Sequence, residues 1–216
     1  MKGDAIVVEK HHVRAAQGVV ALLRSLLDGG GRFTLTIAGE SGSGKSETAQ
    51  AVAEELRSAG VAAVIFQQDD YFVYPPKSND RERRKDIAWV GPQEVHLDLL
   101  DSHLGAFLNG ADTVTKPLVS YIDDSIGEEY LTFDDARVAI AEGTYTTLLE
   151  NASARAFIDR TYLQTRAHRE KRQRDASELD AFIDRVLAIE HEEIASHKAR
   201  ASIIVDEHYD ASAARP

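Results

Sequence analysis

Cysteine is absent from this 216-residue sequence, and cationic residues are in short supply. Without thiols, disulfide bonds, thiolate catalysis and cysteine zinc sites are excluded. Lysine and arginine number 25 against 36 aspartates and glutamates, which gives a formal net charge of −11. A protein whose main partner is a nucleic-acid backbone needs a basic face, so this balance argues against such a partner.

Long hydrophobic runs are also missing. No apolar stretch approaches the length of a membrane span, and the N-terminus lacks the apolar core of a signal peptide. Hydrophobic residues still make up 43% of the chain, as is usual for globular proteins. We expect a soluble cytoplasmic protein with no membrane partner, folded as one α/β domain over residues 1–216; the sequence leaves a homo-oligomer open.

A glycine-rich motif is the strongest feature that is present. It has the pattern G-x-x-x-x-G-K-S, follows a β-forming run (33–38) and precedes a helical pattern (47–59). A strand, a glycine loop and a helix N-terminus form a phosphate cradle, because backbone N–H groups and the helix dipole face the anion. The motif predicts a nucleotide site made by Gly39, Ser41, Gly42, Ser43, Gly44, Lys45, Ser46 and Glu47.

Two side chains of this motif have separate predicted roles. Lys45 would contact the β- and γ-phosphates of ATP, and the Ser46 hydroxyl would ligate Mg²⁺.

The rest of the chain predicts a parallel sheet flanked by helices, an α/β three-layer fold. Helices are expected at 13–27, inside an N-terminal segment 1–32, and at 92–108. Further strands are expected at 61–66, 114–119, 137–141, 154–158 and 201–205.

Carboxylates follow two of these expected strands. Asp69 and Asp70 come after strand 61–66, and Glu142 comes after strand 137–141. Ligands of open α/β sheets lie beyond the carboxyl ends of the strands, so both positions fall on the edge that carries the glycine motif. The pair could meet an acceptor hydroxyl or be an ordinary aspartate turn. Glu142 stands where a metal-organising carboxylate would.

Two basic segments allow two interpretations each. Arg81, Arg83, Arg84 and Lys85, within an excursion at 70–110, could hold a phosphorylated substrate or form a solvated surface. A helical region at 163–200 contains Arg172 and Arg174, and such a segment can close over phosphates as a lid and offset transition-state charge. A solvated cationic helix face is the alternative.

Two histidines of the same region do not predict a zinc site. His191 and His197 are six residues apart, whereas a spacing of four places two imidazoles on one helix face. We expect both side chains to be exposed.

Several separated motifs together resemble the uridine kinase and phosphoribulokinase group of P-loop small-molecule kinases. These motifs are Gly39 to Ser46, Gln68-Asp69-Asp70-Tyr71-Phe72, Glu142-Gly143 and Lys171-Arg172-Gln173-Arg174-Asp175. The resemblance covers most of residues 33–206 and implies a P-loop fold with a helical lid. It also implies that Asp69 accepts the proton of the substrate hydroxyl, that Glu142 belongs to the metal neighbourhood, and that Arg174 with Arg172 or Lys171 contacts the ATP phosphates.

The acceptor side departs from the uridine kinase pattern. The Asp-His-Pro segment that holds the ribose in those enzymes is replaced here by Val90-Gly91-Pro92. A site without that carboxylate forfeits much of its discrimination for ribose hydroxyls, so the acceptor is not fixed as uridine. The predicted substrate contacts are Asp69, Tyr71, Arg83, Arg84 and Tyr121, with Lys116, Asp123 and Asp124 as further candidates.

The sequence therefore predicts a kinase that moves the γ-phosphoryl group of Mg·ATP to a hydroxyl of a small metabolite. Asp69, Lys45 and Arg174 are the predicted catalytic residues, and Ser46 and Glu142 the predicted metal residues. Two alternatives stay open. One is a nucleotide-binding regulatory ATPase without a small acceptor, and the other is a kinase that acts on a nucleic-acid end or a protein.

Overall fold

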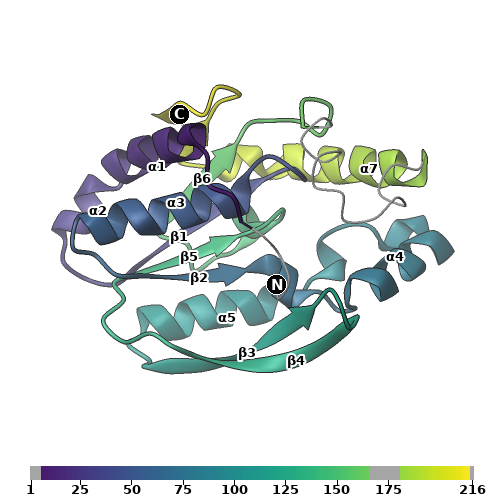
Figure 1. The fold of residues 1–216 in the computed structure, drawn as a ribbon, viewed down its shortest axis with the longest axis horizontal. Coiled ribbons are helices and arrows are strands. Elements are labelled where there is room, and N and C mark those ends of the chain that lie inside the picture. The colour runs from purple at the N-terminus through teal and green to yellow at the C-terminus, as the bar shows by residue number, and fades with distance from the viewer. Residues whose placement is uncertain (1–5, 166–180, 215–216) are drawn as a thin grey trace.

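The computed structural model describes residues 6–165 and 181–214. A six-stranded sheet with the order β2-β5-β1-β6-β7-β8 crosses the molecule between helices (Figure 1). All neighbouring strands pair in parallel except β8, which is antiparallel to β7. The strands of this sheet are β1 (Phe33–Gly39), β2 (Ala63–Gln67), β5 (Val138–Glu142), β6 (Ala154–Ile158), β7 (Ile203–Val205) and β8 (Ala211–Ala213).

Helices pack on both faces of the sheet, which confirms the predicted fold class. The helices are α1 (Lys10–Leu22), α2 (Arg24–Asp28), α3 (Lys45–Ser58), α4 (Pro76–Lys85), α5 (Leu97–Leu108) and α7 (Ala181–His197). One hydrophobic core joins the sheet to α1 and α3, through residues such as Val19 and Val52. A second core joins the other face to α5 and α7, through residues such as Phe107 and Ile194.

Several predicted elements have different boundaries in the structure. The helix predicted at 13–27 is two helices, because a turn at Leu23 separates α1 from α2. The predicted excursion contains α4, and the helix predicted from residue 92 begins at Leu97. The described residues also contain short 3₁₀ turns: η1 (Gln68–Tyr71), η2 (Ile87–Trp89), η3 (Pro92–Glu94), η4 (Thr146–Leu148) and η6 (Lys198–Arg200).

A separate two-stranded sheet lies beside the main one. It is the antiparallel hairpin of β3 (Thr113–Ser120) and β4 (Ser125–Thr132). The extended piece predicted at 114–119 is confirmed as β3. Its partner β4 was not predicted, because most of its residues are exposed and it lacks a buried apolar pattern.

The C-terminal third is described only in part. Of the region 163–200 predicted to form a lid, α7 occupies 181–197. Arg172 and Arg174 lie outside the described residues. Among the helices that the structure does describe, none is long and apolar enough to cross a membrane.

The expectation of two exposed histidines is wrong for His197, which is only 4% exposed at the end of α7. Its Nδ1 contacts the hydroxyl of Thr147 in η4. Burial, together with the charge of Arg200, lowers the pKa of His197 to about 4. The fold therefore holds the neutral imidazole.

Acid is expected to destabilise the fold through this histidine. Between the ordinary pKa of 6.5 and about 4, the unfolded chain binds a proton that the folded chain does not. His197 therefore lowers the free energy of unfolding as the pH falls from 6.5 toward 4. The loss between pH 7 and pH 5 is about 1–2 kcal/mol. Urea denaturation at pH 7, 6 and 5 measures it.

His197→Gln should weaken the dependence of the unfolding free energy on pH, whereas His208→Gln, at an exposed position, should keep it. Equal pH dependence in the wild type and His197→Gln would contradict this role.

Candidate active site

The glycine motif forms the connection between β1 and α3. Gly39, Gly42 and Gly44 all have positive φ angles, which glycine adopts at little cost. A Cβ at Gly39 would lie 2.8 Å from the Ser43 Oγ, so a side chain cannot fit there. The loop thus wraps tightly in front of the α3 N-terminus, the arrangement that binds phosphate groups.

Ser46 and Glu142 meet at the start of α3. The Ser46 hydroxyl donates a hydrogen bond of 3.0 Å to the Glu142 carboxylate, across 96 positions of sequence. Burial raises the pKa of Glu142 to about 7, and the negative charge of Asp69 contributes to the rise, while Lys45 and the Ser46 hydrogen bond oppose it. The Nζ of Lys45 donates to the Glu40 carbonyl oxygen at 3.0 Å.

Strand register explains why these residues converge. β5 lies between β1 and β2, and Glu142 is paired with Ile37 on one side and Gln67 on the other. Asp69 follows two residues after Gln67, in η1. The phosphate loop, Glu142 and Asp69 therefore leave the sheet at the same edge, as the sequence predicts.

The two adjacent aspartates point to different surroundings. Asp69 is half-buried and close enough to Glu142 to affect its pKa. Asp70 is buried and accepts hydrogen bonds from the Lys116 Nζ at 2.8 Å and the Val119 N–H at 3.1 Å, both in β3. Asp69 thus lies near Glu142, whereas Asp70 fastens η1 to the hairpin.

Tyr71 does not lie where a substrate contact is expected. Its side chain is fully buried, and its hydroxyl is 2.8 Å from the Nδ1 of His103 in α5. Burial raises the pKa of the Tyr71 phenol, with the charge of Asp70 adding to the effect. This residue of η1 is buried against α5, which corrects its predicted role as a substrate contact.

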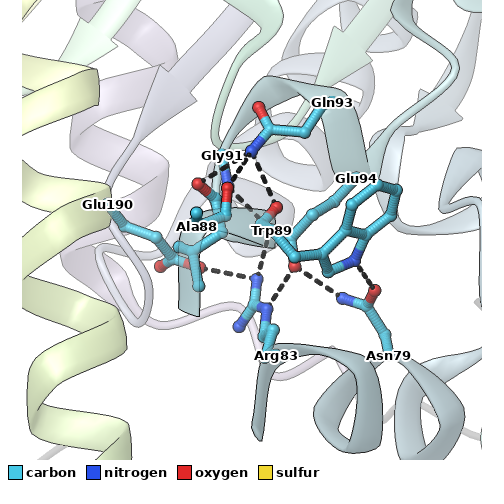
Figure 2. Close-up of polar contacts among 9 residues, drawn as sticks. Asn79, Arg83, Ala88, Trp89, Gly91, Gln93, Glu94 and Glu190 are labelled. Carbon is cyan, nitrogen blue, oxygen red and sulfur yellow. Dashed lines mark hydrogen bonds and ion pairs between the residues drawn. The ribbon is translucent and has the colours of Figure 1, made fainter. Parts of the chain in front are cut away.

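Arg83 is also held inside the protein. Figure 2 shows its guanidinium between Glu94 of η3 and Glu190 of α7. Burial lowers the pKa of Arg83, but the charges of Glu190 and Glu94 outweigh it and raise the pKa overall. Glu94 also accepts hydrogen bonds from the Asn79 side chain and the Gly91 N–H. Arg83 therefore joins α4 to η3 and α7, and its guanidinium is committed to these carboxylates.

Three other basic residues of α4 are paired with carboxylates as well. Arg81 pairs with Asp124, Arg84 with Asp80 and Lys85 with Glu82. Arg84 also lies over the Phe182 ring. At the hairpin tip, Tyr121 is half-exposed, with the Lys77 ammonium 5.7 Å from its ring.

Two residues behind or beside the phosphate loop, Tyr209 and Glu40, were not singled out from the sequence. The Tyr209 hydroxyl donates to the Ser43 carbonyl oxygen at 3.0 Å and accepts from Arg160 at 2.6 Å. The Glu40 carboxylate accepts from the Tyr162 N–H at 2.6 Å and lies 2.7 Å from the Nδ1 of His191. The motif pattern leaves position 40 unspecified, and Tyr209 is too distant in sequence, so no signal marks them.

A cavity of about 300 Å³ opens beside the Ser46–Glu142 pair. It lies between α3, the ends of β2 and β5, and the β3–β4 hairpin. Its described polar lining beyond that pair consists of Gln50, Gln67, Asp70, Lys116 and Glu129. A small molecule in this cavity would lie next to the phosphate loop.

Known proteins resemble the chain over most of this fold. The bifunctional α-galactosidase/sucrose kinase AgaSK of Mediterraneibacter gnavus is 28% identical over 186 residues, which are 81% of this chain and 20% of that protein. A uridine kinase of Macrococcus caseolyticus (strain JCSC5402) is 32% identical over 132 residues, 61% of each chain. The alignments therefore span less than two thirds of either relative.

A solved structure from Silicibacter sp. TM1040, provisionally described as a fructose transport system kinase, has a TM-score of 0.61 with 20% identity, covering 88% of this chain and 93% of that one. This likeness supports the fold. The model of the phosphoribulokinase/uridine kinase family matches residues 34–190. With the phosphate loop, Asp69 and Glu142 at one sheet edge, the chain belongs to the phosphoribulokinase/uridine kinase family of small-molecule kinases.

Proposed function

We propose that this chain transfers the γ-phosphoryl group of Mg·ATP to a hydroxyl group of a small metabolite. The observation that carries the proposal is the convergence of the phosphate loop, the Ser46–Glu142 contact and Asp69 at one sheet edge. Family membership supports a small-molecule kinase. Relatives named for sucrose and for uridine leave the acceptor open.

Each residue has a distinct role in this proposal. The loop N–H groups and Lys45 bind the phosphates of ATP, with the lysine exchanging its bond to the Glu40 carbonyl for a phosphate oxygen. Asp69 orients the acceptor hydroxyl and accepts its proton. Arg172 and Arg174 offset charge on the transferred group, as the family resemblance implies. Catalysis of this kind depends mainly on positioning and electrostatics.

The donor set at the start of α3 fits magnesium. A hydroxyl and a carboxylate are the oxygen ligands that this cation prefers, and Ser46 and Glu142 supply them next to each other. Burial and a neighbouring carboxylate raise the pKa of Glu142. A bound cation would stabilise the ionised carboxylate and so offset both effects. Bound Mg²⁺ supplies charge neutralisation for the phosphates, while Ser46 and Glu142 hold it in place.

The cavity beside this pair favours an acceptor enzyme over a regulatory ATPase, because it offers space for a second molecule. ADP release from Mg·ATP should be measured with uridine, cytidine, pentose phosphates, pantothenate and simple sugars, with Lys45→Ala as the blank. Acceptor-dependent ADP release supports the kinase. Hydrolysis that ignores every acceptor but responds to a protein would support the regulatory ATPase.

Asp69→Asn is expected to lower turnover by about 100-fold or more, because the acceptor hydroxyl loses its base. Nucleotide binding, measured by fluorescence titration, should stay close to that of the wild type. Asp98→Asn, at an exposed position of α5, is the matched control and should leave turnover unchanged. Unchanged turnover in Asp69→Asn would remove this residue from the mechanism.

Glu142→Gln is expected to raise the Mg²⁺ concentration that gives half-maximal activity by about tenfold or more, the usual consequence of losing a metal-site carboxylate. A magnesium titration at constant ATP measures the effect. Glu150→Gln, whose carboxylate is exposed, provides the control. An identical magnesium requirement in Glu142→Gln and the wild type would exclude this carboxylate from the metal site.

A further inference from the structure

Polar side chains line two sides of the cavity beside the phosphate loop. Ser46 and Glu142 lie on one side, and on the other Lys116 of β3 and Glu129 of β4 face each other across the hairpin. At about 300 Å³ it lies at the small end of the range for ligand pockets. An acceptor in it would contact the hairpin while its reacting hydroxyl pointed to the phosphate loop.

Lys116 is the one cationic residue among the described residues that line this cavity, and two carboxylates neutralise its charge. Its side chain is 4% exposed, and its Nζ lies 2.8 Å from Asp70, 2.9 Å from Glu129 and 3.1 Å from the Pro117 carbonyl oxygen. A lysine ammonium has three N–H donors, and these three acceptors use them all. Asp70, Glu129 and Glu142 give the same lining an excess of carboxylates.

Among the described residues, four of the five cations of α4 are paired with carboxylates as well, whereas Lys77 donates to the Ile122 carbonyl oxygen at the hairpin tip. Arg83 is committed to Glu94 and Glu190, and Arg81, Arg84 and Lys85 each pair with a carboxylate. Within the described lining of the cavity, a phosphate or carboxylate on the acceptor would have to break the pairing of Lys116 and approach like charges. That arrangement selects against anions.

We propose that the acceptor is an uncharged polyhydroxylated molecule whose hydroxyl groups are recognised by Glu129. This inference rests on the proposed kinase function. Glu129 is the key contact, because its carboxylate is 42% exposed and still has acceptor capacity beyond its bond to Lys116. Hydroxyl groups can donate to it without displacing the lysine. A site built from such hydrogen bonds discriminates strongly against molecules that cannot make them.

Matched acceptor pairs test the charge of the substrate. Fructose and fructose 6-phosphate, ribose and ribose 5-phosphate, and glycerol and glycerate each differ by one anionic group. Binding to the wild-type protein, saturated with a non-hydrolysable ATP analogue and Mg²⁺, should be measured by calorimetry. ADP release with ATP should be measured in parallel. We expect binding and turnover for uncharged members, with kcat/KM at least about tenfold above that of their anionic partners.

The two readouts separate the two proposals. Tighter binding of the anionic members would overturn the uncharged acceptor and leave the kinase function standing. Binding of uncharged members without phosphoryl transfer would support the pocket and count against the kinase. If no uncharged member binds, the inference fails.

Glu129→Gln tests the specificity residue itself. Losing the carboxylate should raise the KM for the uncharged acceptor about tenfold, which is the effect of one charge-assisted hydrogen bond. It should also reduce the ratio of kcat/KM for the uncharged acceptor to kcat/KM for its anionic partner. The KM for ATP should not change. Glu128→Gln is the matched control, because this neighbouring β4 residue is exposed and its side chain lies on the opposite face of the strand. Equal acceptor KM values in Glu129→Gln and Glu128→Gln would overturn the role of Glu129.

Discussion

The pairing of β5 with both β1 and β2 aligns the carboxyl ends of these strands, so that three functional segments leave the sheet at the same edge. Glu142 is paired with Ile37 and with Gln67, so the phosphate loop, the Glu142 carboxylate and η1 emerge at one level. Side chains alternate across a strand, and a shift of one residue would turn Glu142 to the other face. The contact between Ser46 and Glu142, and with it the proposed magnesium site, depends on this register.

Two kinds of buried charge can be distinguished among the described residues. Arg83 with Glu94 and Glu190, and Lys116 with Asp70, are compensated pairs that fasten α4, α7 and the hairpin to the rest of the fold. Removing one partner from such a pair leaves a buried charge without a counter-charge. These groups therefore stabilise a unique arrangement and are not readily available for chemistry. Glu142 differs, because it accepts a hydrogen bond from the Ser46 hydroxyl and its pKa is raised. Perturbed groups of this kind mark functional sites.

The sequence predicts the parts of the site whose signals are local. The glycine motif, the parallel strands and the carboxylate at the end of β5 each follow from a few adjacent residues, and the structure brings them together as expected. The roles of Tyr71, Arg83 and His197 depend instead on partners such as His103, Glu190 and Thr147, far away in sequence. From the sequence, the polar side chain of each residue suggested an exposed or functional position. The strand β4 was missed because its exposed residues carry no hydrophobic pattern.

Tyr209 has a consequence for how the protein matures. It adopts a left-handed backbone conformation, with φ of 63°, which costs a non-glycine residue about 1–2 kcal/mol. In that conformation its hydroxyl supports the Ser43 carbonyl from 166 positions away. On the ribosome, β1 and α3 emerge long before this tyrosine. The glycine loop of the nascent chain therefore lacks this rear support until the C-terminal strands have been synthesised and have joined the sheet.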